Sequence, residues 1–306
     1  MSVSGHIVAC GVGLKGSTFI EGILKKGIDI HSIVTYPQPD DQTRSFERLC
    51  ELAQRRSINL METRHPVLQP ENLTFLVGWQ QLLPNLTRST VVFHDSLLPR
   101  YRGFAPTVTA LIKGDREIGV TALSPTNAVD EGPIIAQRAL PISYPIKIET
   151  ALKLQAGLMV DIAADIVEQW RCGELSSTLQ QEDKATFSVW RDDADYEIDW
   201  SNNADAIERF VNAVGHPYAG ARTTVGGAET IRVLDVTVVP DMPFEIREAG
   251  KIWKLDSGHP IIICGVGMLR IDNCRREDGS EFLFRHLRTR LGPAQRDFGK
   301  SCVAAT

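Results

Sequence analysis

The chain has 306 residues, of which 43% are hydrophobic and 23% are charged, and its formal net charge is −5. These values are ordinary for a folded globular protein, and the length is comfortable for two domains. A net negative chain has no global basic field to hold nucleic acid, and no apolar run approaches the length of a membrane span. The composition therefore argues against nucleic-acid and membrane partners.

The six cysteines are scattered along the chain, and no pair has the Cys-x-x-Cys spacing of a structural zinc site. The pattern also does not suggest a disulfide framework, so we expect reduced thiols in a cytoplasmic protein and no metal site. The first residues have no basic head and only a short apolar run, which argues against a signal peptide.

The N-terminal residues combine a buried strand with a glycine-rich turn. Residues 6–11 predict the strand, and Gly11, Gly13 and Gly16 have the GxGxxG spacing of a dinucleotide site. The second predicted strand, 28–36, does not end on the carboxylate that such a site needs for the ribose. We therefore expect a tight turn whose free N–H groups, at Gly11 and Gly13, face the substrate pocket. A turn with no ligand is the alternative.

Strands and helices then alternate up to residue 173. Helices are predicted over 17–26, 46–56, 106–113 and 148–170, and strands over 57–61, 74–78, 89–93, 119–123 and 133–140. This alternation indicates an α/β fold with a doubly wound parallel sheet, in which ligands lie at the carboxyl ends of the strands. His94, which follows the 89–93 run, is expected at such an end.

The pattern changes after Gly173, which is expected to end the long helix. Residues 174–184 are polar and are the predicted linker. Next come a predicted helix over 203–214 and short β-like runs at 222–225, 230–239, 251–255, 261–264 and 268–271. Short strands of this kind indicate a small β-barrel. We therefore predict one domain over 1–185 and a second over 186–306.

The stretch 93–137 combines a histidine at a strand end with a carboxylate in a nearby turn. The imidazole is His94 and the carboxylate is Asp130. A carboxylate beside a histidine favours the imidazolium and fixes its tautomer, which suits a general acid or base. On spacing alone, a core histidine and an unrelated turn aspartate are the alternative.

The same stretch carries a family resemblance. FHDSLLPRYRGFAP (93–106), the GVT that follows, and Asp130 with Gly132 resemble the N10-formyltetrahydrofolate-dependent formyltransferases. Residues 190–221 and 260–273 resemble the C-terminal domain of that family, so nearly the whole chain is covered. The resemblance implies a Rossmann-like formyltransferase domain followed by an OB-like barrel. It also implies transfer of a formyl group from N10-formyltetrahydrofolate.

The resemblance implies catalytic roles for two residues and a departure at a third. His94 matches the family histidine, and Asp130 matches the aspartate that polarises it. The family asparagine, which shares in the proton transfer and in holding the oxyanion, lies two residues before the histidine; here that position is Val92. Valine cannot donate a hydrogen bond, and loss of one oxyanion donor costs about 10²- to 10³-fold in rate. Asn127 is the nearest candidate for a substitute; otherwise the chain is slow, takes an unusual acceptor, or only binds folate or nucleotide.

For the folate, the resemblance implies contacts from a loop after the 74–78 strand and from the turn before Asp130. The residues concerned are Gln81, Leu82 and Leu83 in the loop, and Thr126, Asn127, Ala128 and Val129 in the turn. Free backbone groups in an apolar loop suit a flat pterin edge, although such a loop could also simply pack on the sheet.

For the acceptor, the resemblance implies Ser96, Tyr101 and Arg102, besides the glycine turn. Arg102 could meet a phosphate or carboxylate, or could have a structural role alone. The tRNA-modifying members carry a long basic loop after the second strand. In this chain the corresponding loop, residues 37–42, is short and acidic. From Arg191 onward, acidic residues also outnumber basic ones.

We therefore expect a small amine acceptor, most specifically a nucleotide-linked 4-amino sugar, because 190–221 most resembles that branch of the family. Initiator methionyl-tRNA, hydroxyornithine and amino acids stay open as alternative acceptors. A homodimer stays open as well.

Overall fold

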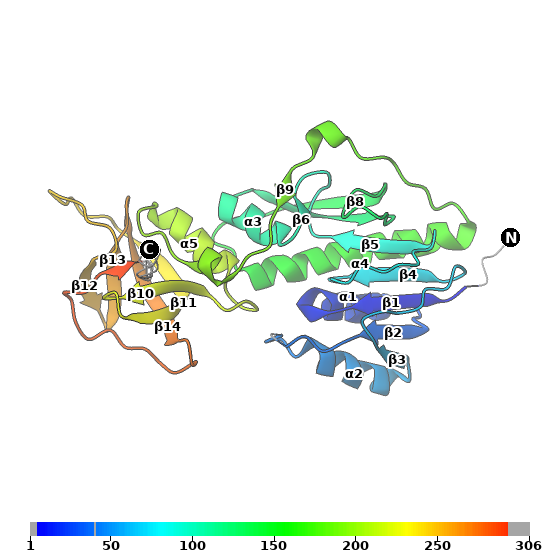
Figure 1. The fold of residues 1–306 in the computed structure, drawn as a ribbon, viewed down its shortest axis with the longest axis horizontal. Helices are drawn as coiled ribbons and strands as arrows, with labels where there is room; N and C mark the ends of the chain where they lie inside the picture. Colours follow the sequence, from blue (N-terminus) through cyan, green and yellow to red (C-terminus); the bar gives the residue numbers. More distant parts are fainter. Residues whose placement is uncertain (1–4, 40, 293–306) are drawn as a thin grey trace, which may run out of the picture. The chain divides into compact units, whose positions relative to one another are not determined.

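The structure is a computed structural model that describes residues 5–39 and 41–292. The chain forms two compact units, each shown in Figure 1. The first runs to Arg191 and includes His216–Tyr218; the second has Asp192–Gly215 and continues from Ala219. The two predicted domains, divided at residues 185 and 186, stay a prediction. None of the described helices is long and apolar enough to cross a membrane.

The first unit is built on a seven-stranded sheet with the order β3-β2-β1-β4-β5-β7-β8. The strands are β1 (Ile7–Gly11), β2 (Ser32–Thr35), β3 (Asn59–Glu62), β4 (Leu73–Val77), β5 (Thr90–His94), β7 (Glu117–Leu123) and β8 (Ile134–Pro141). From β3 to β5 all neighbours are parallel, which confirms the predicted α/β fold and Rossmann-like sheet. The last two strands, β7 and β8, run antiparallel to their neighbours.

The antiparallel β7 has a consequence for the carboxyl edge of β5. Because β5 and β7 are antiparallel neighbours, the end of β5 and the start of β7 lie at the same edge of the sheet. The connection between them, residues 95–116 with helix α3 (Pro106–Lys113), therefore begins and ends at that edge. This single segment therefore lies at the carboxyl edge of the parallel strands, where such sheets bind their ligands.

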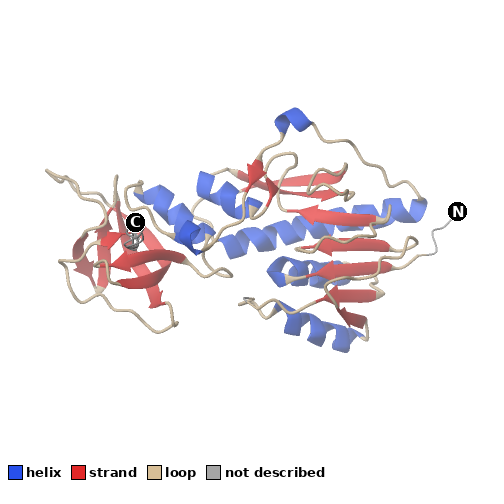
Figure 2. Cartoon of the chain, viewed as in Figure 1, coloured by secondary structure: helices blue, strands red, loops and turns tan. Residues whose placement is uncertain are grey.

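The two faces of this sheet are covered differently. One face packs on helices α1 (Gly13–Lys25), α2 (Ser45–Arg56) and α4 (Ile148–Cys172), which lie on one side of the strands in Figure 2. The other face buries Val8 and Cys10, among others, against loop residues such as Leu68 and Leu83. In the described part of the chain, loops thus cover the face where a doubly wound sheet usually carries further helices.

Glycines shape both ends of the helices that flank the sheet. A Cβ on Gly16 would lie 2.6 Å from the backbone of Gly11, so only glycine lets α1 approach β1 this closely. Gly13 begins α1 with φ +65°. As predicted, Gly173 ends α4, with φ +72°.

The second unit is a curled antiparallel sheet with the order β12-β13-β14-β11-β10-β15, preceded by helix α5 (Ala204–Ala213). Its strands are β10 (Ala221–Val225), β11 (Glu229–Val239), β12 (Ile252–Asp256), β13 (His259–Ile263), β14 (Met268–Arg276) and β15 (Leu291–Gly292). A bridge between Lys251 and Arg290 brings the two edges of the sheet together. The sheet therefore curls on itself, which confirms the predicted OB-like second domain.

The segment predicted to be a linker, 174–184, is not free of the first unit. Thr178 pairs with Ile134 of β8, and a short 3-10 helix, η1, covers Glu182–Lys184. Just beyond it, β9 (Phe187–Ser188) pairs in parallel with β6 (Arg102–Gly103). Most side chains of the segment are exposed, as its polar sequence predicted, but Gln180 and Glu182 form hydrogen bonds within this unit.

Candidate functional site

The candidate site lies at the carboxyl edge of the first unit's sheet. Gly11, Val77 and Phe93 are paired in one row across β1, β4 and β5, so these strands end together. The run Thr90–Phe93 is apolar and β-branched, which suits a strand buried on both faces. His94 is the last residue of this strand, and its side chain is buried with an exposed fraction of 8%.

The structure brings His94 and Asp130 together. The imidazole Nδ1 lies 3.4 Å from the Asp130 Oδ1, and the Nε2 lies 2.8 Å from the backbone carbonyl oxygen of Tyr101. Both of these oxygens only accept hydrogen bonds. A neutral imidazole can donate to one of them, whereas the imidazolium can donate to both. The arrangement is therefore suited to taking up a proton and holding it while a reaction proceeds.

Burial and charge act on His94 in opposite directions. Burial lowers the pKa of His94 below its usual value, and the charge of Lys15 lowers it further. The Asp130 carboxylate and the hydrogen bond to the Tyr101 carbonyl raise the pKa, but less than burial lowers it. His94 is thus mostly neutral at pH 7, which is the state that a general base requires.

Asp130 lies in the connection between β7 and β8, and this connection brings it to His94. The residue has φ +58°, a left-handed conformation that costs a non-glycine residue roughly 1 kcal/mol. Its Oδ2 accepts a hydrogen bond from the backbone N–H of Gly103 at 2.8 Å. A Cβ on Gly132 would lie 1.8 Å from the carbonyl oxygen of Ser124, which explains the glycine two residues later. The Asp-x-Gly pattern is therefore a requirement of this turn.

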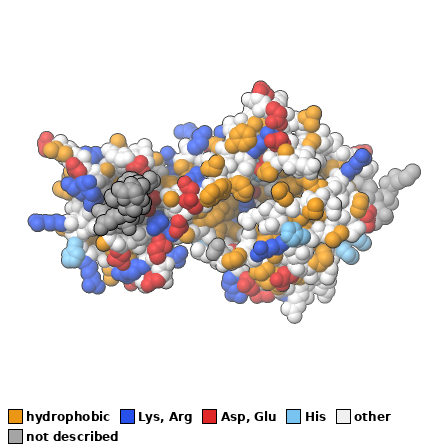
Figure 3. All heavy atoms as spheres, in the orientation of Figure 1, with side chains coloured by type: hydrophobic (Ala, Val, Ile, Leu, Met, Phe, Trp, Pro, Cys, Tyr) orange, Lys and Arg blue, Asp and Glu red, His pale blue; other side chains and the backbone are white. Residues whose placement is uncertain are grey.

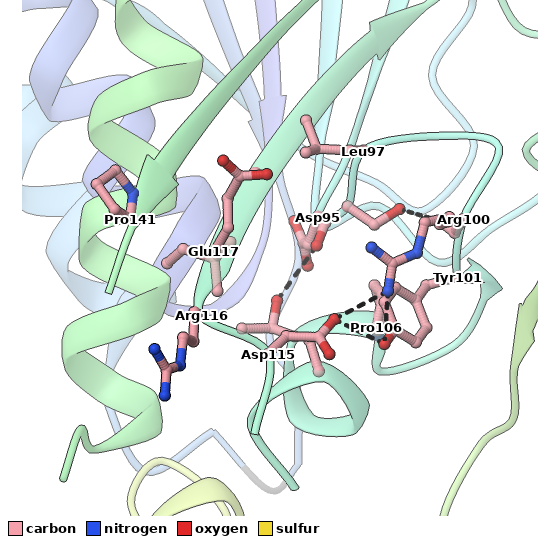
Figure 4. A pocket seen from close by; sticks show the side chains of 14 residues that line it. Asp95, Leu97, Arg100, Tyr101, Pro106, Asp115, Arg116, Glu117 and Pro141 are labelled. Atoms are coloured by element: carbon pink, nitrogen blue, oxygen red, sulfur yellow. Dashed lines mark hydrogen bonds and ion pairs between the residues drawn. The ribbon is translucent and has the colours of Figure 1, made fainter. Parts of the chain in front are cut away.

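A cavity of about 450 Å³ lies behind the loop that follows His94. Ser96 and Tyr101, both predicted to contact the acceptor, line it together with the charged residues Asp95, Arg100, Asp115, Arg116 and Glu117. Figure 4 shows the Tyr101 hydroxyl and the Arg100 guanidinium pointing to Asp115, at 2.8 Å and 3.1 Å. Tyr101 therefore connects the two places, because its carbonyl meets His94 and its hydroxyl faces the cavity.

Arg102, the third residue predicted to meet the acceptor, is buried, with an exposed fraction of 2%. Its guanidinium donates to Glu182 at 2.7 Å and 2.8 Å and to the Gln180 Oε1 at 2.9 Å and 3.2 Å. Protein groups thus take up this side chain. The geometry favours the structural role that the sequence left open over contact with a phosphate.

Lys15 and Asp95 form a partly buried ion pair, with side-chain exposed fractions of 22% and 9%, that the sequence analysis missed. Lys15 comes from the first turn of α1, just after Gly13, and Asp95 directly follows His94. Burial lowers the pKa of Lys15 to about 8. A lysine in the first turn of a helix opposes the helix dipole, and this was the signal available in the sequence. The first N–H groups of any helix lack a partner within the helix. Here no side chain caps them, so the N–H groups at the start of α1, near Gly13, are not taken up by a cap.

The two loops predicted to hold the folate differ in exposure. Leu83 is buried in the core of the loop-covered face, whereas Leu82 is 79% exposed and Gln81 is half-buried. The turn formed by Thr126, Asn127, Ala128 and Val129 is exposed throughout. In the described part of the chain no hydrogen bond joins Asn127 to His94.

Val92 lies two residues before His94 and on the same, loop-covered face, where it packs against the apolar core of that face. The position where the family resemblance places an amide is therefore apolar. Among residues 5–39 and 41–292, no cluster of three His, Cys, Asp or Glu side chains is arranged to hold a metal ion.

Comparison with protein families finds two matching models. "Formyl transferase" matches residues 8–156, and "Formyl transferase, C-terminal domain" matches residues 191–286, so the two together cover most of the chain. A methionyl-tRNA formyltransferase of Methylobacillus flagellatus is 37% identical over 191 residues, which are 61% of this chain and 58% of that protein. One from Lactococcus lactis is 29% identical over 290 residues, covering 87% of this chain and 88% of that protein.

Among solved structures, WlaRD, a sugar 3N-formyl transferase solved with dTDP and 5-N-formyl-THF, has a TM-score of 0.64. It is 15% identical and is covered over 98% of its length by 90% of this chain. HypX from Aquifex aeolicus, solved with tetrahydrofolic acid, has a TM-score of 0.62 and 15% identity. This chain, over 91% of its length, covers 45% of HypX. At these identities the two structures show a shared fold alone.

Proposed function

This chain belongs to the formyl transferase family, and from that premise we propose that it transfers a formyl group from N10-formyltetrahydrofolate to the primary amine of a small acceptor. The observation that carries the proposal is the contact between His94 and Asp130 at the carboxyl edge of the sheet. An acid–base pair at a strand end is what formyl transfer to an amine needs.

In the proposed mechanism, the Nε2–H of neutral His94 donates to the Tyr101 carbonyl, and its Nδ1 takes the proton from the amine as the amine nitrogen attacks the formyl carbon. Asp130 and the Tyr101 carbonyl hold the imidazolium that forms. The same proton then passes to the N10 nitrogen as its bond to the formyl carbon breaks, which leaves tetrahydrofolate and the formamide. His94 returns to its neutral form, so the residue is regenerated in each cycle.

For the donor, we propose that the backbone at Gln81, Leu82 and Leu83 and the turn 126–129 contact the folate. Burial of Leu83 fixes the first loop, while its neighbour Leu82 is left exposed. The exposed turn 126–129 leads directly into Asp130. This pairing of a fixed loop with a turn that carries the carboxylate would bring the donor's formyl group to His94.

For the acceptor, we propose a nucleotide-linked 4-amino sugar, held by Ser96, Tyr101 and the backbone of Gly11 and Gly13. The cavity of about 450 Å³ beside Tyr101 has the size of a small-molecule site, which is commonly about 300 to 1,000 Å³, and of the four residues only Ser96 and Tyr101 line it. It is lined by hydroxyl, carboxylate and guanidinium groups that suit a polar ligand. Two solved neighbours, WlaRD and an N-formyltransferase from Helicobacter canadensis solved with dTDP-3-aminofucose, are described as acting on or binding amino sugars.

Methionyl-tRNA is the second candidate acceptor, because the two sequence relatives compared above are methionyl-tRNA formyltransferases. The net charge of −5 argues against a tRNA surface. On the face shown in Figure 3, acidic and basic side chains are interspersed on each unit. Amino acids and hydroxyornithine belong in the same panel of candidate amines.

The assay supplies N10-formyltetrahydrofolate with each candidate amine and follows the release of tetrahydrofolate. We expect turnover with an amino-sugar nucleotide and a loss of about 10²- to 10⁴-fold in His94→Ala and Asp130→Asn. His65→Ala and Asp183→Asn are matched controls, because both side chains are exposed. Turnover that is indifferent to the first two changes would remove this pair from the mechanism. Turnover with charged tRNA and none with sugars would replace the proposed acceptor.

Val92 motivates a different class of function, a folate or nucleotide binder without catalysis. Calorimetric titration with a folate and with amino-sugar nucleotides separates the two classes. Binding of both ligands with no tetrahydrofolate release from any amine in the panel would favour the binder. Release at any rate that depends on His94 favours the enzyme.

A further inference from the structure

Gln180 connects the turn of Asp130 to the buried Arg102. Its side-chain Nε2 donates hydrogen bonds to the carbonyl oxygens of Asp130, at 2.7 Å, and Gly132, at 2.8 Å. Its Oε1 accepts from the Nη2 and Nε of Arg102, at 2.9 Å and 3.2 Å. An amide has two N–H donors and two acceptor lone pairs, and all four are used here.

Gln180 belongs to a longer segment, residues 178–188, that we name the clasp. Thr178 exchanges backbone hydrogen bonds with Ile134 at 2.7 Å and 2.8 Å. Glu182 holds the guanidinium of Arg102, and the carbonyl oxygen of Thr186 accepts from the Arg102 N–H at 2.8 Å. The clasp is thereby joined both to the strand after the Asp130 turn and to the loop after His94.

The turn that Gln180 holds is under strain. Asp130 has a left-handed backbone, which persists only where the surroundings impose it. Its carboxylate is placed by two other contacts, the Gly103 N–H and His94. Gln180 is the side chain that holds the backbone of this turn, through the Asp130 and Gly132 carbonyls.

We propose that Gln180 is a positioning residue for the proposed formyl transfer: by tying the Asp130–Gly132 backbone to Arg102, it keeps the Asp130 carboxylate against His94. The catalytic part of this inference rests on the proposed function. The geometric part concerns only the His94–Asp130 contact and is independent of which amine is formylated.

A direct readout is the titration of His94, since Asp130 is one of three groups that act on its charge. Asp130 and the Tyr101 carbonyl raise the pKa of His94, and Lys15 lowers it. If Gln180 positions Asp130, then removing Gln180 weakens a raising influence and the pKa of His94 falls. A residue that only stabilised the fold would lower the melting temperature and leave this pKa in place.

The experiment compares Gln180→Leu with Gln181→Leu, whose parent side chain is adjacent, exposed and without a recorded side-chain contact. The ring carbon of 13C-labelled histidine is followed by NMR from pH 4 to pH 8, as far on the acid side as each variant stays folded, with His94→Gln assigning the signal. We expect the pKa of His94 to fall in Gln180→Leu, in the same direction as in Asp130→Asn, and to stay in Gln181→Leu. We also expect kcat to fall about 10- to 100-fold with both KM values within about twofold.

Gln180→Glu tests which half of the side chain matters, and it also serves if Gln180→Leu does not fold. It keeps the acceptor for Arg102 but, when ionised, has no N–H for the Asp130 and Gly132 carbonyls. Its added negative charge itself raises the pKa of His94, so this variant is judged by kcat, which we expect to fall as in Gln180→Leu. A wild-type His94 titration in a folded Gln180→Leu, alongside a shift in Asp130→Asn, or a wild-type kcat in a folded Gln180→Glu, would overturn the proposal.

The failure of the proposed function gives a different result. In that case no amine would release tetrahydrofolate from the wild-type chain. The His94 titration would still shift, or not, with Gln180.

Discussion

Among residues 5–39 and 41–292, one arginine is buried in each compact unit, and the two arginines hold different parts of the molecule. Arg102 in the first unit is joined through Gln180 to the turn of Asp130. Arg232 in the second unit donates to Asp193 at 2.9 Å and to Glu277 at 3.1 Å. The first network ends next to His94, whereas the second joins β11 to Asp193, near the start of the second unit, and to Glu277, directly after β14. A buried arginine with polar partners therefore positions the candidate site in one unit and stabilises the fold in the other.

The two units also differ in where their charges lie. At the sheet edge of the first unit, His94, Asp95 and Asp130 are buried or nearly so. The partners of Arg232 in the barrel are well exposed, with 65% for Asp193 and 44% for Glu277. Buried titratable groups are costly unless they are paired, and they concentrate at functional sites. This contrast points to the first unit as the place of the chemistry.

The largest expected effect separates the two regions by stability. Lys15→Met leaves the buried Asp95 carboxylate without its partner, and we expect a loss of about 3 to 5 kcal/mol in the free energy of unfolding. Arg232→Met leaves carboxylates that water can reach, so we expect a loss of about 1 to 2 kcal/mol. Urea unfolding measures both. The double change Lys15→Met/Asp95→Asn should recover part of the first loss, and equal losses in the two single variants would contradict the contrast.

The second prediction separates the two arginines by their effect on kcat. We expect Arg102→Met to lower kcat about 10- to 100-fold, because the Asp130 turn loses the group to which Gln180 is tied. Arg232→Met should leave kcat within about twofold. The tetrahydrofolate-release assay measures both at a temperature where each variant is folded. If Arg232→Met slowed the reaction as much as Arg102→Met, the division of roles between the two arginines would be wrong.

A third change tests the apolar position below His94. We expect Val92→Asn to raise kcat by about tenfold, because it adds an amide donor on the face that carries His94. Val92→Leu, which adds no donor, is the control and should not be faster than the natural chain. A folded Val92→Asn variant with no gain in rate would mean that another group already holds the developing oxyanion.

The smallest effect concerns pH. Because the pKa of His94 is lowered in the folded chain, kcat/KM should stay level down to pH values below the usual histidine pKa of about 6.5. As the pH falls through 6.5, His94 takes up a proton in the unfolded chain before it does so in the folded chain. The free energy of unfolding therefore decreases as the pH falls below about 6.5. Asp130→Asn removes a raising influence and should move the acid limb lower still. A limb that moved upward would contradict this electrostatic account.

Much of the fold could be predicted because burial leaves a local record in the sequence. Short, continuous apolar runs such as Thr90–Phe93 are typical of strands that are buried on both faces. Gly173 marks the end of α4. His94 and Asp130 stood out because a motif joined them. The direction of β7 could not be predicted, since a strand buries the same residues whichever way it runs.

The sequence by itself determined the α/β unit, the curled barrel and the residue types available for proton transfer, because each follows from neighbours within a few positions. Only the tertiary structure decided that Lys15 pairs with Asp95, 80 positions away, and that Gln180 ties Asp130 to Arg102. These contacts join segments that are brought together by the packing of strands and loops, and no local pattern encodes such a meeting. The physical reason is that burial is a property of each residue, whereas a hydrogen bond between distant side chains is a property of the completed fold.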